Sequence, residues 1–340
     1  MRSPPASTSD ARVNGLPAWI GAVLDRNLEN VSRAALREAA LAASQGYRAG
    51  GGSAVIRSGL DALAYAVVRM PATYAAADAA LSQAARAIPD FAPRSLLDLG
   101  AGPGTAAWAA AAVWPSLTHA ALIDRNAHLL ALARQFGAEA PLDAAIRQAD
   151  IADALAAGPG ADVVIASYTL AELAPAALAA AVGRLWTAAA RLVVLVEPGT
   201  TDGFKRILAC RDILLGQGAA IVAPCSHEQA CPLAAAPRWC HFGVRLPRSR
   251  AHRLSKGASL AYEDEKFSYL AAGKGFDRLA RGERILATPK VGKAGVALTL
   301  CRPAAAEQRM VPRRQVQAYK VAKALGWGDA ISGDLGAPKR

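Results

Sequence analysis

The sequence predicts an α/β protein with a helical N-terminal region, a parallel sheet covered by helices on both faces, and a basic C-terminal extension. Three observations lead to this class. Residues 16–92 carry apolar side chains at helical spacing. From residue 93 onward, short apolar runs alternate with helix-like segments, which is typical of a parallel sheet. All of the net positive charge lies in the last hundred residues.

The strands of the predicted sheet are short apolar runs at 95–99, 119–123, 162–166 and 191–196, with helix-like segments such as 126–135 and 175–189 between them. Two further strands, near 219–223 and 241–246, flank a cysteine-rich stretch. The chain then offers a strand at 295–300 and a helix-like end at 313–325. The predicted parts are a disordered tail (1–15), a helical region (16–92), a cofactor-binding domain (93–246), a basic extension (247–325) and a second tail (326–340).

Composition excludes several classes of protein. Of the 340 residues, 53% are hydrophobic and 19% charged, which argues against global disorder. The longest uncharged run, between Asp98 and Asp124, is interrupted by glycines and prolines, so we expect no membrane segment. The N-terminal "MRSPPASTSDARVNG" lacks the apolar core of a secretion signal. We therefore expect reduced cysteines and no disulfide framework.

The charge of the chain is placed unevenly. Residues 1–240 hold 19 basic and 19 acidic side chains, whereas residues 241–340 hold 20 basic and 8 acidic ones. A neutral body with a basic C-terminal third indicates a polyphosphate partner such as nucleic acid. A merely solubilising surface is the alternative.

The segment "LLDLGAGPGT" (96–105) places three glycines between the first strand of the sheet and the next helix. Glycines there allow positive φ and a close approach of the backbone to a ligand. The spacing departs from G-x-G-x-x-G, because Thr105 stands where the last glycine would be. Asp98 at the strand end suits a cationic ligand better than a pyrophosphate. Asp124 ends the second strand, where a carboxylate can accept both ribose hydroxyls.

Together these features resemble the class I S-adenosylmethionine-dependent methyltransferase fold. The resemblance implies that Asp98 and the glycine loop hold the methionine part of the cofactor, Asp124 the ribose, and Asp150 with Ile151 the adenine. A nicotinamide-binding domain and a fold that has lost its cofactor are the alternatives. The expected cofactor-binding residues are Asp98, Gly100, Gly102, Gly104, Thr105, Asp124, Arg125, Asp150, Ile151 and Ser167.

The acceptor side of the pocket is less defined. The fourth strand leads into "ASYTLAEL" (166–173), without the Asn/Asp-Pro-Pro-aromatic sequence of amino-methylating nucleic-acid enzymes. Ser167, Tyr168 and Glu172 are candidates to line the pocket, and Glu197 ends the fifth strand. We take Tyr168 and Glu197 as catalytic candidates, with packing and helix capping as their alternative roles.

Three of the five cysteines lie in "APCSHEQACPLAAAPRWC" (223–240). The motif "APCS" resembles the loop in which RNA cytosine-C5 methyltransferases keep a cysteine nucleophile. That loop follows the fourth strand, whereas Cys225 comes after the fifth strand and a further helix, so metal ligation fits better. The ligand candidates are Cys225, Cys231, Cys240 and Cys301, and four thiolates suit either zinc or an iron–sulfur cluster. Cys210 is expected to be a buried thiol.

The order of motifs over residues 16–325 resembles the methyltransferase-like proteins of the small ribosomal subunit, a family of bacteria and mitochondria. The motifs are "RMPATYAA", "LLDLGAGPGT", "SYTLAEL", "VLVEPGT", "PCSHEQACP", "WCHFGVRLPRS", "YEDEKFSYL" and a late strand-end cysteine. In that family four cysteines bind an iron–sulfur cluster. The resemblance therefore implies a cluster, of the 4Fe–4S type, at Cys225, Cys231, Cys240 and Cys301, with zinc as the alternative.

The resemblance further implies binding to small-subunit ribosomal RNA during ribosome assembly. It leaves open a methyltransferase that acts on this RNA, a non-catalytic assembly factor with the same fold, an RNA cytosine-C5 methyltransferase that uses Cys225, and a small-molecule methyltransferase. We expect a ribosome-associated protein of the bacterial cytoplasm rather than of the mitochondrial matrix. Away from the ribosome we expect a monomer.

Overall fold

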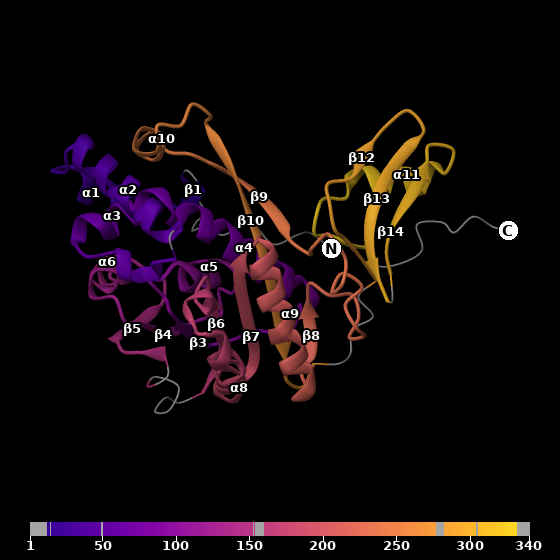
Figure 1. Cartoon of the computed structure of the whole chain (residues 1–340), viewed down its shortest axis with the longest axis horizontal. Coiled ribbons are helices and arrows are strands. Elements are labelled where there is room, and N and C mark those ends of the chain that lie inside the picture. The colour runs from indigo at the N-terminus through magenta and orange to yellow at the C-terminus, as the bar shows by residue number, and fades with distance from the viewer. Residues whose placement is uncertain are drawn as a thin grey trace.

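The computed structural model describes residues 12–13, 15–48, 50–151, 153, 160–276, 282–303 and 305–331. Most of the two expected tails lies outside these residues, but their described ends form strands, β1 and β15, instead of disordered chain. The N-terminal region is helical (Figure 1). Its elements are β1 (Arg12–Val13), β2 (Leu16–Pro17), α1 (Ala18–Leu28), α2 (Arg33–Arg48), the 3-10 helix η1 (Gly52–Val55), α3 (Gly59–Val68) and α4 (Met70–Ala87).

The central sheet has eight strands. Its main path runs β5-β4-β3-β6-β7-β10-β8, and β9 pairs with β10. The strands are β3 (Ser95–Leu99), β4 (His119–Asp124), β5 (Asp143–Gln148), β6 (Ala161–Ser167), β7 (Ala189–Pro198), β8 (Ala220–Ala223), β9 (Phe242–Pro247) and β10 (Tyr262–Gly273). Between them lie α5 (Thr105–Val113), α6 (Ala127–Gly137), η2 (Leu170–Glu172), η3 (Pro175–Ala177), α8 (Leu178–Ala188), α9 (Thr201–Gly216) and α10 (Arg250–Lys256).

The strand directions identify the fold. Strands β3 to β7 are parallel to their neighbours, whereas β10 is antiparallel to both β7 and β8. A parallel sheet with one antiparallel strand inserted before the last strand is the order of the class I methyltransferase sheet. The predicted fold class is therefore confirmed.

Alternate residues of the strands bury their side chains on opposite faces of the sheet. Leu96 and Val194 pack against the N-terminal helices together with α5 and α6, while Leu97 and Val193 pack against α8 and α9. Each fully buried aliphatic side chain of this kind stabilises the fold by about 1.5–3 kcal/mol. The loops at the carboxyl ends of β3, β4 and β6 lie at one edge of this sandwich, where open α/β sheets bind ligands.

The C-terminal part forms a second sheet with its own core (yellow in Figure 1). Its strands run β12-β13-β11-β15, with β14 pairing β13. They are β11 (Glu283–Ile285), β12 (Lys290–Val291), β13 (Gly295–Arg302), β14 (Ala305–Pro312) and β15 (Ala330–Ile331), and α11 (Val316–Ala324) packs against β13 and β14.

Strand β10 returns to the central sheet beyond residue 246, where the cofactor-binding domain was expected to end. The first half of β10 pairs only with β9 and carries four consecutive charged residues, 263–266, so its sequence lacks an apolar run. Its second half is buried between β7 and β8. The sheet domain therefore extends to Gly273, and the arm formed by β9, α10 and β10 projects from it.

Candidate functional site

The glycine loop joins β3 to α5 in a left-handed backbone conformation. Gly100, Gly102 and Gly104 have φ values of 68°, 55° and 85°, a region that glycine enters without strain. The amide of Gly100 donates a hydrogen bond to Ile123 O at 2.8 Å, which ties the loop to β4. A Cβ added at Gly102 would meet only Leu129, at 3.8 Å. The loop therefore leaves open space directly beside Gly102.

Two buried polar atoms at this loop have no hydrogen-bond partner. Asp98 is 1% exposed; its Oδ2 accepts a hydrogen bond from the Ala107 amide at 3.1 Å, but its Oδ1 accepts none. The hydroxyl of Thr105, at the start of α5, is also unpartnered. Burial raises the pKa of Asp98 to about 7. Unsatisfied buried polar atoms are costly, so this pair favours a ligand that supplies hydrogen-bonding groups.

We predict that Asp98→Asn changes how stability depends on pH. The folded pKa of Asp98, about 7, exceeds its ordinary value of 3.8. Its stabilising contribution is therefore fully present below pH 3.8 and is lost as pH rises through about 7. Between pH 5 and 7 the free energy of unfolding of the unaltered protein should fall by up to about 1.4 kcal/mol per pH unit relative to Asp98→Asn. Urea unfolding at pH 5 to 8 without added cofactor checks this, and parallel curves would contradict it.

Asp124 anchors the loop from the neighbouring strand. Its Oδ2 accepts a hydrogen bond from the Gly102 amide at 2.8 Å, and its Oδ1 accepts one from the Asn126 amide at 2.7 Å. The carbonyl of Asp124 accepts the amide of Ala149, which brings the β5 end with Asp150 and Ile151 alongside. A carboxylate has about four lone-pair positions, so Asp124 keeps capacity for a ligand.

The segment η1 of the N-terminal region contacts the loops that follow β4 and β6. The backbone amide of Ser53 donates to Glu172 Oε1 at 2.7 Å, and Arg125 pairs with Glu172 Oε2 at 2.8 Å. The side-chain amide of Asn126 donates to Ser53 O at 3.0 Å. These contacts join three loops: the one between α2 and α3, the one after β4 and the one after β6. Arg125, which we expected to bind the cofactor, thus takes part in the contacts that join these three loops.

The acceptor side is a polar network around Tyr168. This residue follows Ser167 at the end of β6 and has a φ of 58°. Its hydroxyl donates to Glu265 Oε1 at 2.8 Å, and the Arg69 guanidinium lies 5.1 Å from the centre of its ring. Arg69 also binds Glu265 through two hydrogen bonds, of 2.8 and 2.9 Å. Burial raises the pKa of Tyr168 well above its ordinary value, so the phenol stays neutral.

Glu197 has a structural role in this fold. It is fully buried near the end of β7, where Oε2 pairs with Arg206 at 2.6 Å and Oε1 accepts the Leu170 amide at 3.1 Å. Burial raises its pKa to about 7, and Arg206 opposes that shift. Both carboxylate oxygens are therefore engaged in holding η2 and α9. The catalytic role proposed for Glu197 receives no support from these contacts.

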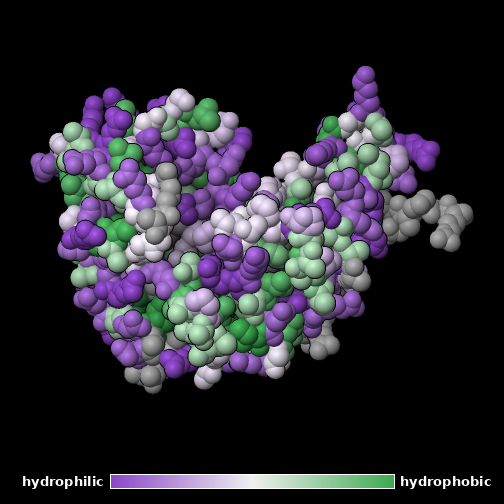
Figure 2. Space-filling model, viewed as in Figure 1, coloured by the Kyte–Doolittle hydropathy of each residue, from purple (hydrophilic) through white to green (hydrophobic). Residues whose placement is uncertain are grey.

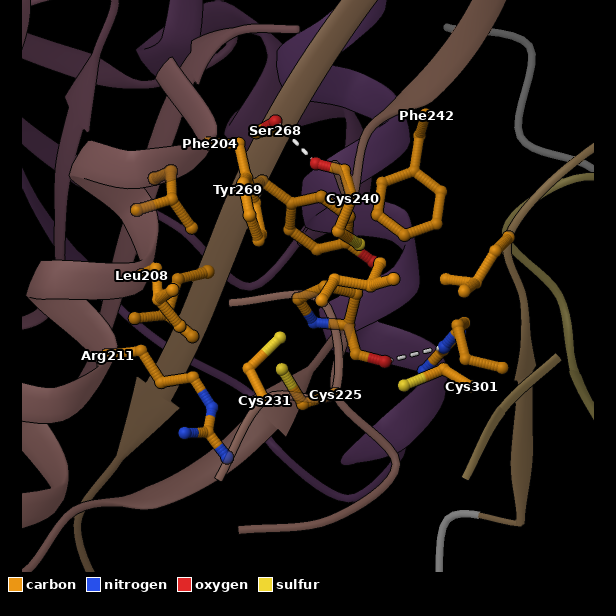
Figure 3. Close-up of a pocket in the computed structure, with 16 residues that line it drawn as sticks. Phe204, Leu208, Arg211, Cys225, Cys231, Cys240, Phe242, Ser268, Tyr269 and Cys301 are labelled. Carbon is orange, nitrogen blue, oxygen red and sulfur yellow. Dashed lines mark hydrogen bonds between the residues drawn. The ribbon is translucent and has the colours of Figure 1, made fainter. Parts of the chain in front are cut away.

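A buried cavity of about 40 Å³ lies between the central sheet and the C-terminal sheet, and all four candidate ligand cysteines line it. Figure 3 shows Cys225, Cys231, Cys240 and Cys301 around this space. The first three come from the chain between β8 and β9, and Cys301 comes from β13. The two sheets are joined beside it, because Ser226 donates to Cys301 O at 3.1 Å. Cys210, in contrast, is fully buried on α9, as predicted.

Burial disfavours the thiolate form of Cys231, Cys240 and Cys301. Burial raises the pKa of Cys301 to about 12 and raises those of Cys231 and Cys240 as well. Neighbouring cysteines raise these pKa values further, whereas Arg211 lowers those of Cys231 and Cys301 and Arg284 lowers that of Cys240. The four sulfur atoms therefore share one electrostatic environment.

The sulfur atoms do not converge on a point that a single ion would occupy. Among the described residues, no three Cys, His, Asp or Glu side chains are close enough together to hold one metal ion. The Zn–S distance of about 2.3 Å requires sulfur atoms about 3.8 Å apart in a tetrahedron. We expected the four sulfur atoms to surround one centre. The structure places them around one cavity, but not close enough together for a single ion. The spacing is wider than a single zinc ion needs.

A family model described as "Mitochondrial small ribosomal subunit Rsm22" matches residues 59–332 of the chain. The chain belongs to the Rsm22 family. Human "Ribosome assembly protein METTL17, mitochondrial" is 28% identical over 288 residues, which cover 79% of this chain and 62% of the human protein. An Rsm22-cox11 tandem protein of Schizosaccharomyces pombe is 27% identical over 336 residues, covering 78% and 42% of the two chains. This Rsm22-family chain thus spans less than two thirds of either relative.

Solved structures are less similar to this Rsm22-family chain. The magnesium protoporphyrin IX methyltransferase of Synechocystis is 14% identical, with 77% of this chain and 100% of that one covered and a TM-score of 0.40. A TM-score of 0.40 is too low to assign the fold. The fold assignment rests on the strand order instead.

The expected location in the bacterial cytoplasm is contradicted by the comparison. The matching family and the human and yeast relatives are all named as mitochondrial. The expectation rested on composition, which does not separate one reducing compartment from another. Residues 1–11 lie outside the described part of the chain. Within the described part, no helix is both long enough and apolar enough to span a membrane.

Sequence reasoning missed several residues of the cofactor side in this Rsm22-family protein. Tyr47 and Tyr65 from the N-terminal helices interact electrostatically with Asp124 and Glu172. Arg69 opens the motif "RMPATYAA", and Glu265 lies in "YEDEKFSYL". Both motifs stood out in the sequence as family features. Their charged members could have been assigned to the site only by knowing that β10 returns beside β7.

Proposed function

We propose that this chain is a small-subunit assembly protein that binds S-adenosylmethionine at the glycine loop, holds an iron–sulfur centre with four cysteines, and contacts ribosomal RNA with its C-terminal sheet. Membership of the Rsm22 family supports the assembly role, since the human relative is named a ribosome assembly protein. One observation carries the proposal: Cys225, Cys231, Cys240 and Cys301 all line the same cavity.

The residues of the glycine loop fit the proposed cofactor. S-Adenosylmethionine carries an ammonium group and ribose hydroxyls, which complement the unpartnered Asp98 Oδ1 and the remaining lone pairs of Asp124. The open space beside Gly102 allows close approach of a ligand. When bound, the cofactor would supply an activated methyl group. Asp98, Thr105 and Asp124 would bind and orient it.

The surroundings of Tyr168 support a binding role over methyl transfer. A general base must accept a proton, but the Tyr168 hydroxyl donates to Glu265 and its pKa is raised. Glu265 itself is held by Arg69 on both oxygens. Methyl transfer to RNA is the second candidate, and the intact glycine loop favours it. RNA cytosine-C5 methylation by Cys225 gains no support, since Cys225 lines the cavity between the two sheets rather than the cofactor pocket.

The test combines three measurements on protein purified without oxygen. We expect visible absorption with bound iron and sulfide, binding of S-adenosylmethionine by calorimetry, and no methyl transfer to purified small-subunit particles. Transfer of a labelled methyl group to the RNA would replace the binding role with the enzymatic one. Colourless protein without iron would overturn the iron–sulfur part. Light scattering would test the monomer that we propose away from the ribosome.

Ion pairs divide the basic C-terminal third into neutralised and free cations. Cations of the arm and of β13 and β14 are paired with carboxylates. The pairs are Arg245 with Asp264, Arg248 and Lys256 with Glu263, Arg302 with Glu283 and Glu307, and Arg309 with Glu283. Within the described residues, the other exposed cations of the second sheet have no such partner. These are Lys290, Lys293, Arg313, Arg314, Lys320 and Lys323, which we call the basic tip.

Contacts join the turn after β12, Arg313 and α11, which carry cations of the basic tip. Lys293 lies in the turn between β12 and β13, and the Arg313 amide donates to Ala294 O in that turn at 3.2 Å. The Arg313 guanidinium lies 5.7 Å from the ring centre of Tyr319 on α11, which carries the last two lysines. Figure 2 shows hydrophilic side chains protruding from this lobe at the upper right. Unpaired cations clustered in this way support phosphate binding.

We predict that the double charge reversal Lys290→Glu with Lys293→Glu weakens binding to small-subunit ribosomal RNA at least tenfold. The slope of log affinity against log salt should become shallower by about 1.4 to 1.8, since each lost phosphate contact removes about 0.7 to 0.9. Filter binding over a series of KCl concentrations measures both quantities.

The matched control is Arg134→Glu with Arg184→Glu, which makes the same change in net charge on exposed residues of α6 and α8. It should leave the affinity and the salt slope nearly unchanged. Equal losses for both double variants would mean that the RNA responds to overall charge and not to the basic tip.

A further inference from the structure

The four-cysteine cavity also contains both of the buried arginines among the described residues. Arg211 is 3% exposed and Arg284 is 4% exposed, and no other described Arg or Lys side chain is buried. Arg211 comes from α9 and Arg284 from β11, so each sheet domain contributes one. Both line the same cavity as the cysteines. Figure 3 shows Arg211 near Cys231 on one side of this space.

Among the described residues, no buried carboxylate pairs with either guanidinium. Arg284 donates to Pro224 O at 2.6 Å, to Gly328 O at 2.7 Å and to the side-chain oxygen of Gln83 at 3.1 Å, all of which are neutral. The three partners come from separate segments of the chain, so this guanidinium is held in a fixed position by uncharged groups.

The positive charge of Arg211 is also balanced only weakly by its neighbours. It donates to the carbonyls of His227 and Gln229 at 3.1 and 2.7 Å. Its one carboxylate neighbour, Asp212, is 3.4 Å away with a side chain 67% exposed, and its buried Nε has no partner. Glu197, by comparison, is a buried charge that pairs with Arg206. An uncompensated buried charge costs several kcal/mol, so these two cations call for an anion.

We propose that Arg211 and Arg284 are the built-in counter-charges of an anionic metal–thiolate centre bound by the four cysteines, and that they stabilise its bound form. This inference rests on the proposed function. As each sulfur–metal bond forms, the thiol proton leaves to solvent. Four thiolates around a [4Fe–4S]²⁺ core carry a net charge of 2−. Two guanidinium groups balance that charge.

The counter-charges act on both sides of the cavity. Arg211 lines it from α9 and Arg284 from β11, so each guanidinium places a positive charge beside the cysteines. Stabilising the thiolates in this way favours their binding to metal. For an iron–sulfur centre, a nearby positive charge also favours the state with the additional electron, so the reduction potential should depend on the charge at position 211.

The experiment compares Arg211→Gln with Arg211→Lys after reconstitution with iron and sulfide without oxygen. Arg211→Gln should lose iron to a chelator at least tenfold faster than the unaltered protein. Its equilibrium constant for one-electron reduction should be about tenfold lower, which is about 59 mV in a dye-mediated titration. Arg211→Lys keeps the charge and should restore most of both quantities, although it loses hydrogen bonds to the carbonyls.

Equal iron release and equal potentials in all three proteins would overturn the inference while leaving the iron–sulfur proposal intact. Equal defects in Arg211→Gln and Arg211→Lys would also overturn it, because geometry and not charge would then be responsible. Absence of iron from the unaltered protein would instead be a failure of the proposed function. Circular dichroism of each apo form checks that all three proteins fold alike.

Discussion

Replacing Cys301 by serine is expected to abolish iron binding and to loosen the C-terminal sheet. Cys301 is the one ligand candidate that the second sheet supplies, so it links β13 to the three cysteines between β8 and β9. Structural metal centres contribute about 10 kcal/mol or more to folding. Losing one of four ligands should therefore lower the free energy of unfolding of this region by several kcal/mol.

The measurements are iron content after anaerobic purification and hydrogen exchange of the amides in β11 and β13. Serine preserves the shape of the side chain, and the hydrogen bond from Ser226 goes to the backbone oxygen of residue 301, so packing is retained. The internal control is Cys210→Ala, which removes a buried thiol outside the cavity and should keep its iron. Full iron occupancy with unchanged exchange in Cys301→Ser would refute the four-cysteine site.

The order of strands and helices in the central sheet could be predicted from sequence because periodicity and burial agree there. Strand β3 lies at the predicted 95–99, and β4 and β6 each exceed the predicted runs by one or two residues. Strand β10 could not be predicted, since its outer half holds four consecutive charged residues, 263–266, and pairs only with β9 in a two-stranded ribbon. The pairing that buries its inner half is set by β7 and β8, about 50–80 residues away in the chain.

The candidate sites differ in the same way. The glycine loop is local, so its spacing alone predicted both the left-handed turns and the position of Asp98. The cysteines were found by their number and by a resemblance, but the cavity and its two arginines depend on how the sheets meet. Arg284 follows Glu283 in an ordinary charged stretch, and nothing in its sequence context distinguishes it. Its burial becomes apparent only through its bonds to Pro224 and Gly328.

Substitution of Gly104 by alanine is expected to destabilise the protein by about 2–5 kcal/mol, the sum of a left-handed backbone penalty and overpacking. A Cβ at this position would lie 2.5 Å from Trp108 Cε2. The indole cannot move aside easily, because Nε1 donates to Pro103 O at 2.8 Å and the ring packs edge to face on Trp19 at 5.7 Å. Urea unfolding measures the loss, and a stability equal to that of the unaltered protein would show that the indole yields.

Substitution of Gly102 by alanine separates binding from stability at the same loop. Its φ of 55° carries a similar backbone penalty, about 1 kcal/mol, but the added methyl group meets only Leu129 at an ordinary contact distance. The free protein should therefore lose little stability. A cofactor lying against the loop would contact the methyl group, so the dissociation constant for S-adenosylmethionine should rise at least tenfold, about 1.4 kcal/mol. Because the expected loss of stability is small, weaker binding in calorimetry could not be attributed to a misfolded loop. Unchanged binding would mean that the cofactor does not approach Gly102.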